Sequence, residues 1–122
     1  RASGIKAPLI IGVTVLTSEA KNSKIIPLVI SLTKAAKNAG LDGVVASVKE
    51  TRHLRQKFSR DLIIVTPGIR LAGDEKGGQK RIATPEEARS AGSNYIVVGR
   101  PILEAENPVS AAREIIRKIS LK

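Results

Sequence analysis

Residues 66–88 read TPGIRLAGDEKGGQKRIATPEEA, and this stretch carries the signals that decide the fold. It continues the apolar run LIIVT at 62–66, passes through a loop rich in glycine and basic residues, and ends in Thr84-Pro85-Glu86-Glu87. Threonine before proline, with glutamate three positions after the threonine, is typical of a helix N-terminus closed by a capping box. The stretch therefore predicts a strand, a loop whose glycines let the backbone approach an anion, and a helix ending at Gly92.

The same order of elements recurs on both sides of this stretch. Apolar, β-branched runs that do not alternate with polar residues predict strands of a parallel sheet, buried on both faces, at residues 9–16, 43–47, 62–66 and 95–99. Helical segments are expected between and after them, at about 26–38, 49–58, 84–92 and 108–119, the last with Asn107 as its N-cap. This α/β pattern of four β-α units fits a small open sheet or half of an eight-stranded barrel, and spacing alone leaves both open.

Length and composition restrict the class of protein. The 122 residues suffice for one domain, so we treat 1–122 as a single domain whose core is built from aliphatic side chains, because aromatic residues make up only 2%. The lack of cysteine excludes disulfides, thiolate metal sites and a cysteine nucleophile. No apolar run approaches the length of a membrane span, and the first residues lack a signal-peptide pattern. We expect a soluble, cytoplasmic protein with no membrane partner.

The formal net charge of +10 is concentrated in residues 1–60, which carry eleven basic side chains and three acidic ones. Such asymmetry can indicate a nucleic-acid partner, but only Phe58 and Tyr95 could stack on bases. The densest basic run, KETRHLRQKFSR at 49–60, spaces Arg52 and Arg55 as a solvated helix face would. We interpret it as such a face and do not expect nucleic-acid binding. His53, the only histidine, falls in the same run, so no metal site is expected.

Candidate binding residues follow the last two predicted strands. Ligands of parallel α/β folds bind where strands end, and Gly99 with Arg100 ends the last one, before a turn at Pro101. Arg70 ends the neighbouring strand, and Gln79 lies on the loop between them. Glycine, arginine and free backbone N–H groups suit a phosphate, and in eight-stranded barrels the phosphate site commonly follows the last two strands. The alternative, two ordinary capped strand ends, stays open on spacing alone.

Five motifs taken together resemble one known family. VTVLTS, DGVVAS, VTPGIR, GGQKRIATPEEA and YIVVGRPI occur in the order found in the C-terminal half of orotidine 5′-phosphate decarboxylase, and the likeness covers about Leu9 to Ile119. The resemblance implies that the fold is half of a (β/α)8 TIM barrel with four parallel β-α units. It further implies that the ligands are orotidine 5′-phosphate (OMP) and its decarboxylation product UMP, and that the protein serves pyrimidine biosynthesis.

The resemblance also assigns roles by position within the motifs. The residues that it assigns to the phosphate are Arg70, Gln79, Gly99 and Arg100. Thr17 corresponds to a threonine that contacts the nucleotide, and Pro67 lies where the family lines its pyrimidine pocket. The loop from Leu71 to Arg81 corresponds to the segment that closes over the bound nucleotide.

The family's catalytic array is absent from this sequence. That array contains an Asp-x-Lys-x-x-Asp pattern, which cannot be drawn through Asp42, Asp61 or Asp74, the only aspartates. We therefore expect no catalytic residue, cofactor or metal site here, and little or no activity from the chain alone.

A half barrel would have unpaired edge strands and an uncovered inner face, so we expect a complementing N-terminal half or a second copy of the chain as partner. The alternative function is that of a non-catalytic remnant that binds nucleotides or RNA.

Overall fold

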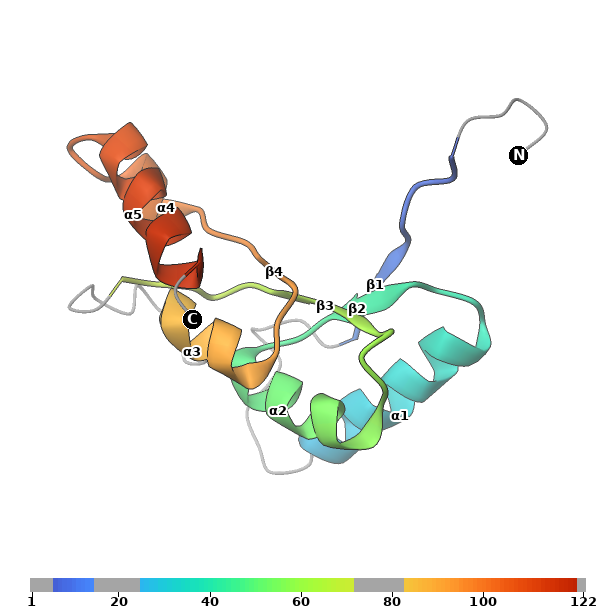
Figure 1. Cartoon of the computed structure of the whole chain (residues 1–122). Coiled ribbons are helices and arrows are strands. Elements are labelled where there is room, and N and C mark those ends of the chain that lie inside the picture. Colours follow the sequence, from blue (N-terminus) through green and yellow to red (C-terminus); the bar gives the residue numbers. More distant parts are fainter. Residues whose placement is uncertain (1–5, 15–24, 72–82, 121–122) are drawn as a thin grey trace.

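The computed structural model describes residues 6–14, 25–71 and 83–120, which contain one parallel sheet and five helices (Figure 1). The strands are paired in chain order: β1 (Ile11–Val13), β2 (Gly43–Val45), β3 (Ile63–Thr66) and β4 (Tyr95–Ile96). The helices are α1 (Ile25–Asn38), α2 (Val48–Lys57), α3 (Pro85–Ala91), α4 (Arg100–Leu103) and α5 (Pro108–Ser120). The predicted order of four β-α units is confirmed, with shorter strands than predicted and with α4 as an additional, unpredicted turn of helix.

The two faces of the sheet differ in what covers them. Helices α1, α2 and α3 lie against one face (Figure 1), where Val44 and Ile64 are fully buried. The neighbouring row of the register, made of Val13, Val45, Val65 and Tyr95, points to the other face. Val13 keeps 62% and Tyr95 57% of their surface exposed, and no described element covers this open face. The prediction of burial on both faces is thus wrong for this chain, because the described helices that pack on the sheet, α1 to α3, all lie on one side of it.

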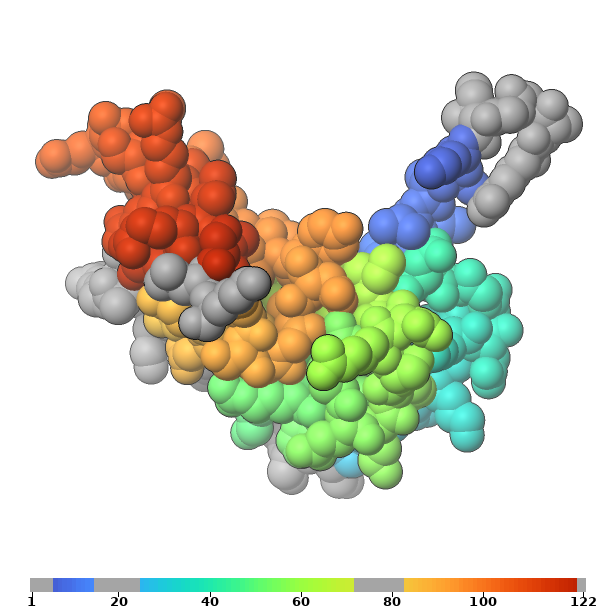
Figure 2. Space-filling model, in the orientation of Figure 1, coloured from blue at the N-terminus to red at the C-terminus, as the bar shows by residue number. Residues whose placement is uncertain are grey.

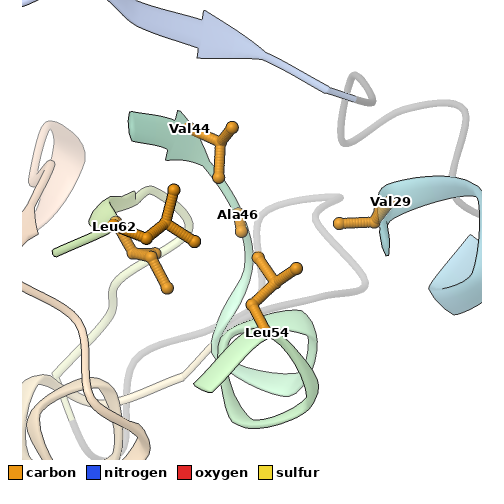
Figure 3. Close-up of a cluster of buried hydrophobic side chains, with 6 residues drawn as sticks. Val29, Val44, Ala46, Leu54 and Leu62 are labelled. Atoms are coloured by element: carbon orange, nitrogen blue, oxygen red, sulfur yellow. The ribbon is translucent and has the colours of Figure 1, made fainter. Parts of the chain in front are cut away.

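The main core lies between the sheet and helices α1 and α2. Figure 3 shows Val29 of α1 and Leu54 of α2 directed toward Val44, Ala46 and Leu62. Burying an aliphatic side chain of this size stabilises the fold by about 1.5–3 kcal/mol. A second cluster under α3 joins the segments that flank the candidate site: Val48, Ile69, Ala83, Ala88 and Ala91. None of the helices described here is long and apolar enough to cross a membrane.

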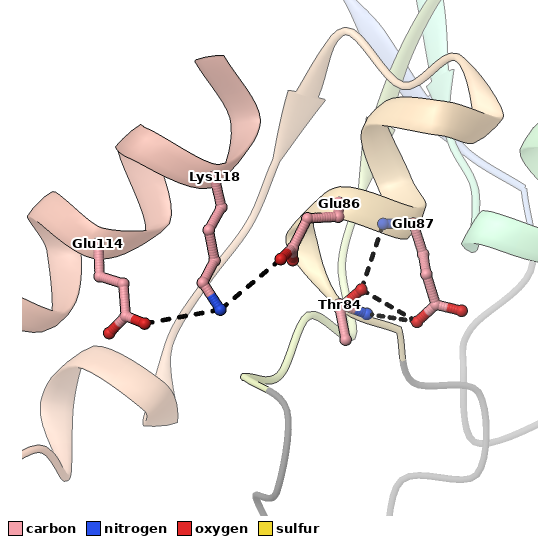
Figure 4. A network of polar contacts seen from close by, with 5 residues as sticks. All are labelled: Thr84, Glu86, Glu87, Glu114 and Lys118. Carbon is pink, nitrogen blue, oxygen red and sulfur yellow. Dashed lines mark hydrogen bonds and ion pairs between the residues drawn. The ribbon is translucent and has the colours of Figure 1, made fainter. Parts of the chain in front are cut away.

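Side-chain caps determine where three helices begin. Thr84 accepts from the backbone N–H of Glu87 and donates its own N–H to the Glu87 carboxylate at 2.9 Å, as the capping box predicts (Figure 4). Ser47 and Glu50 form the same box at the start of α2. Asn107 accepts from the N–H of Ser110 at 3.1 Å, which confirms it as the predicted cap of α5.

Arg55 does not belong to a solvated helix face as the sequence suggested. Its Nε donates to the carbonyl of Gly92 at 2.9 Å, and its Nη1 donates to the carbonyl of Leu62 at 2.7 Å. Its Nη2 donates to Oδ1 of Asn94 at 2.6 Å. These bonds tie the end of α2 to the beginnings of β3 and β4, whereas Arg52 is exposed, as the sequence predicted.

Gly43 is required where β2 approaches β3. A Cβ atom added at Gly43 would lie 2.0 Å from the carbonyl oxygen of Ile63, its partner in the register. Gly43→Ala should therefore lower the free energy of unfolding by about 2–3 kcal/mol, measured by urea denaturation. Gly12→Ala is the matched control, since the close contact of its Cβ would be with the end of the Leu41 side chain, which can move, and the Gly43 carbonyl oxygen would lie at 4.0 Å, an ordinary contact distance. Equal losses in the two variants would contradict this explanation.

The capping box of α3 should make stability depend on pH. The Thr84 backbone N–H and then the Thr84 hydroxyl donate to Glu87 and lower the pKa of that carboxyl. Because its folded-state pKa is depressed, the stabilisation is present above the ordinary glutamate pKa and lost as the pH falls through the folded value. Thr84→Ala should cost about 1 kcal/mol at neutral pH. Glu87→Gln should destabilise at pH 7 and have no effect at acidic pH, while Glu106→Gln, an exposed control, should change neither.

Candidate functional site

The Pro-Gly-Ile-Arg motif places Arg70 through its backbone. Gly68 has φ 76°, a left-handed conformation that glycine adopts without strain, and it turns the chain at the end of β3. Ile69 is then buried to 1% exposure in the cluster under α3 and bridges to Ala83. The N–H of Arg70 donates to the carbonyl of Ala83 at 2.8 Å, and the N–H of Ala83 donates to the carbonyl of Gly68 at 3.0 Å. Arg70 is therefore attached to a fixed stretch of main chain.

The chain after β4 places Arg100 in a similar way. Gly99 is the N-cap of α4, and its carbonyl accepts from the N–H groups of Ile102 and Leu103, both at 3.0 Å. Arg100 is the first residue of this helix and is exposed, whereas Pro101 beside it is buried. The turn predicted at Pro101 is thus a short helix with a buried proline in its first turn.

Arg70 and Arg100 line the same cleft, which has a volume of about 640 Å³. Its remaining wall comes from the segment after β3 and from α4 and α5: Leu71, Pro101, Glu104, Ala105, Asn107, Ser110, Ala111 and Glu114. The cleft therefore holds two guanidinium groups and two carboxylates. Such a mixed site can bind an anion if the arginines face it and the carboxylates are engaged elsewhere.

Lys118 engages one of these carboxylates and connects α5 to α3. Its Nζ lies 3.5 Å from Oε1 of Glu114 and 3.7 Å from Oε2 of Glu86, at the start of α3 (Figure 4). The side chain of Lys118 is only 17% exposed, and Ala111 and Ile115 on the same helix are buried. The wall that α5 contributes to the cleft is thus held by packing together with the contact of Lys118 with two carboxylates.

The structure brings together only part of the predicted site. Arg70 and Arg100 share the cleft, while Gly99 and the half-buried Pro67 lie at the same edge of the sheet without lining it. Thr17, Gln79 and the predicted closing loop beyond Leu71 lie outside the described residues, whereas Leu71 itself lines the cleft. Sequence reasoning missed Glu104, Glu114 and Lys118, although the four-residue spacing of Glu114 and Lys118 is a recognisable helix ion-pair signal. Among the described residues, no group of three His, Asp or Glu side chains could hold a metal ion.

The sheet is built from parallel β-α units, and two arginines lie at the ends of adjacent strands. These features define the class of the protein as an α/β fold of the barrel type. The sequence matches the Orotidine 5'-phosphate decarboxylase / HUMPS family over residues 2–115, and the chain belongs to that family. It is 46% identical over 123 residues to the orotidine 5'-phosphate decarboxylase of Coxiella burnetii, covering 94% of this chain and 52% of that protein. The corresponding protein of Pseudoalteromonas translucida is 48% identical, over 95% of this chain and 53% of its own length.

Solved structures agree with this assignment. The orotidine 5'-phosphate decarboxylase of Lactobacillus acidophilus superposes with a TM-score of 0.79 and 34% identity, over 98% of this chain and 52% of that one. The Pyrococcus horikoshii OT3 enzyme gives a TM-score of 0.72 and 28% identity, over 93% and 52%. The predicted fold, half of a (β/α)8 barrel, is confirmed, and the chain spans about half the length of the relatives it matches.

The contacts of α5 predict that buried packing holds this helix, and with it the cleft wall, more strongly than the ion pairs of Lys118 do. Ile115→Ala should lower the free energy of unfolding by about 2–4 kcal/mol, because it opens a cavity beneath the helix. Lys118→Met should cost less than about 1 kcal/mol, because both carboxylates are about half exposed to solvent. Hydrogen exchange of α5 amides in both variants is the measurement. A larger loss from Lys118→Met would mean that the ion pairs, and not packing, hold the cleft wall.

Proposed function

We propose that this chain forms the C-terminal half of an orotidine 5′-phosphate decarboxylase barrel and that the cleft between Arg70 and Arg100 receives the 5′-phosphate of OMP and UMP. The observation that carries the proposal is that these two arginines, from the ends of adjacent strands, line one cleft in a member of this family. Arginine forks bind phosphate through paired N–H donors, and both arginines are attached to hydrogen-bonded main chain. We also propose that the phosphate is contacted by Gly99 and Gln79 and the nucleotide by Thr17. The pyrimidine pocket is proposed to be lined by Pro67.

The contribution of this half to catalysis is binding and orientation. Phosphate is remote from the carboxylate that leaves as CO₂, so contacts with it can hold the nucleotide in the reactive position and raise the rate as well as the affinity. The Asp-x-Lys-x-x-Asp array that acts on the pyrimidine in the family is absent from this sequence. The isolated chain is therefore proposed to be inactive or nearly so.

A complementing N-terminal half is the partner that we propose, with a homodimer as the second arrangement. The row of Val13, Val45, Val65 and Tyr95 presents an apolar wall on the open face of the sheet. In closed (β/α)8 barrels such inward rows pack against the rows of the remaining strands. β1 and β4 are the outer strands of the described sheet and would pair with those strands. The cytoplasm is the proposed location.

The test is complementation with a defined second half. The chain is mixed with the part of the Coxiella burnetii relative that it does not match, and loss of OMP absorbance is followed for each polypeptide and for the mixture. Turnover only in the mixture is expected. Turnover by the chain alone would contradict the assignment of the chemistry to the other half. Silence in the mixture, together with UMP binding by the chain, would favour the non-catalytic remnant.

Arg100→Ala should weaken catalysis in the complemented enzyme by about 2–4 kcal/mol of transition-state stabilisation, seen as a fall in kcat/KM. Arg113→Ala removes the same charge from α5 outside the cleft and should leave kcat/KM within about two-fold. Equal effects of the two substitutions would contradict the phosphate assignment. RNA binding would instead weaken steeply with salt in both variants.

A further inference from the structure

A second cleft lies at the opposite edge of the sheet. It has a volume of about 450 Å³ and is lined by three arginines, Arg55, Arg60 and Arg89, together with Asn94 and residues 90–92. Arg60 precedes β3 and Asn94 precedes β4, whereas Arg70 and Arg100 follow those same strands. Because parallel strands begin at one edge and end at the other, this three-arginine cleft is separate from the cleft described above.

Arg55 forms the fixed wall of the three-arginine cleft. Its guanidinium group is held by the carbonyls of Gly92 and Leu62 and by Oδ1 of Asn94, at 2.6–2.9 Å. Burial, and then the positive charge of Arg60, lower the pKa of Arg55. The guanidinium groups of Arg55 and Arg60 therefore repel each other, and an anion bound between them would relieve that repulsion.

The other arginines of this cleft have no side-chain partner among the described residues. Arg60 and Arg89 are exposed, and the guanidinium of neither forms a hydrogen bond or ion pair in the described ranges. Among the described residues that line the cleft there is no aspartate or glutamate, and Asp61, next to Arg60, is not one of them. This composition differs from the cleft of Arg70 and Arg100, where two carboxylates are present.

Asn94 adds a further donor group to the three-arginine cleft. Oδ1 of Asn94 already accepts from Arg55 and from the backbone N–H of Ile64, at 2.6 and 2.8 Å, which leaves its NH₂ group without a described acceptor. The carbonyl of Arg89 at the end of α3 accepts from Gly92, and that of Ala88 from Ser93, both at 3.1 Å. The cleft thus offers positive charge and N–H donors, and these carbonyls of the helix end do not compete for them.

We propose that the three-arginine cleft binds a compact polyanion of the polyphosphate class, such as the di- or triphosphate group of a nucleotide. Three guanidinium groups around one small volume call for a ligand with several negative charges, and tetrahedral phosphates accept arginine forks. A volume of about 450 Å³ accommodates a small molecule of this kind. The cleft does not depend on the proposed decarboxylase function, because it lies at the other edge of the sheet.

The experiment is an NMR titration of the purified chain with tripolyphosphate at constant ionic strength. The variant is Arg60→Gln with Arg89→Gln, and both residues are exposed, so the fold should be retained. The control is Arg113→Gln with Arg117→Gln, which removes the same charge from the exposed side of α5. We expect the amide signals of Gly92 and Asn94 to shift, with a loss of affinity of at least about ten-fold in the variant and less than about two-fold in the control.

Three outcomes would overturn the proposal. Equal weakening in the variant and the control would show that net charge alone attracts the anion. Shifts confined to residues near Arg70 and Arg100 would assign tripolyphosphate to the other cleft. Single-stranded RNA that binds more tightly than tripolyphosphate, with the same dependence on Arg60 and Arg89, would identify the surface as a nucleic-acid site instead.

Discussion

Parallel pairing along β3 is the constraint on which both clefts depend. β3 lies between β2 and β4, with Gly43 opposite Ile63 and Tyr95 opposite Val65. Pairing resumes beyond the turn at Gly68, where Ile69 bridges to Ala83. Since all strands run in one direction, the side chains that follow them collect at one edge, and those that precede them collect at the other. A slip of one residue in this register would exchange the buried and the open faces of the sheet.

The open face of the sheet leaves apolar side chains of this half barrel exposed to solvent. Helices α1 to α3 cover one side of the sheet, and Figure 2 shows the side between the N-terminal segment and α5 as hollowed. Val13 and Tyr95 are more than half exposed on the open face, where the hydrophobic effect favours burial by about 25 cal/mol per Å². Covering this face is thus a physical reason for association with a second half, independent of catalysis.

The two clefts differ in how their charges are balanced. Glu104 and Glu114 stand in the cleft of Arg70 and Arg100, and Lys118 holds Glu114 from the side. Any phosphate that enters there must be bound against nearby carboxylates, so the affinity depends on how well the arginines are oriented. In the three-arginine cleft the described lining contains no carboxylate, and Arg55 is oriented before any ligand arrives. Preorganised, uncompensated positive charge is the property that favours anion binding.

The sequence by itself determined the order of elements, the caps at Thr84 and Asn107, and the family, because these depend on local residue patterns. It also indicated that Arg70 and Arg100 follow neighbouring strands. Only the tertiary structure decided that Arg55 is a structural contact and not a solvated residue, because its acceptors lie up to 39 positions away. Likewise, the strand runs could not reveal which face stays open or that Arg60 and Arg89 line one cleft. Those features arise from packing between distant segments, which no local pattern encodes.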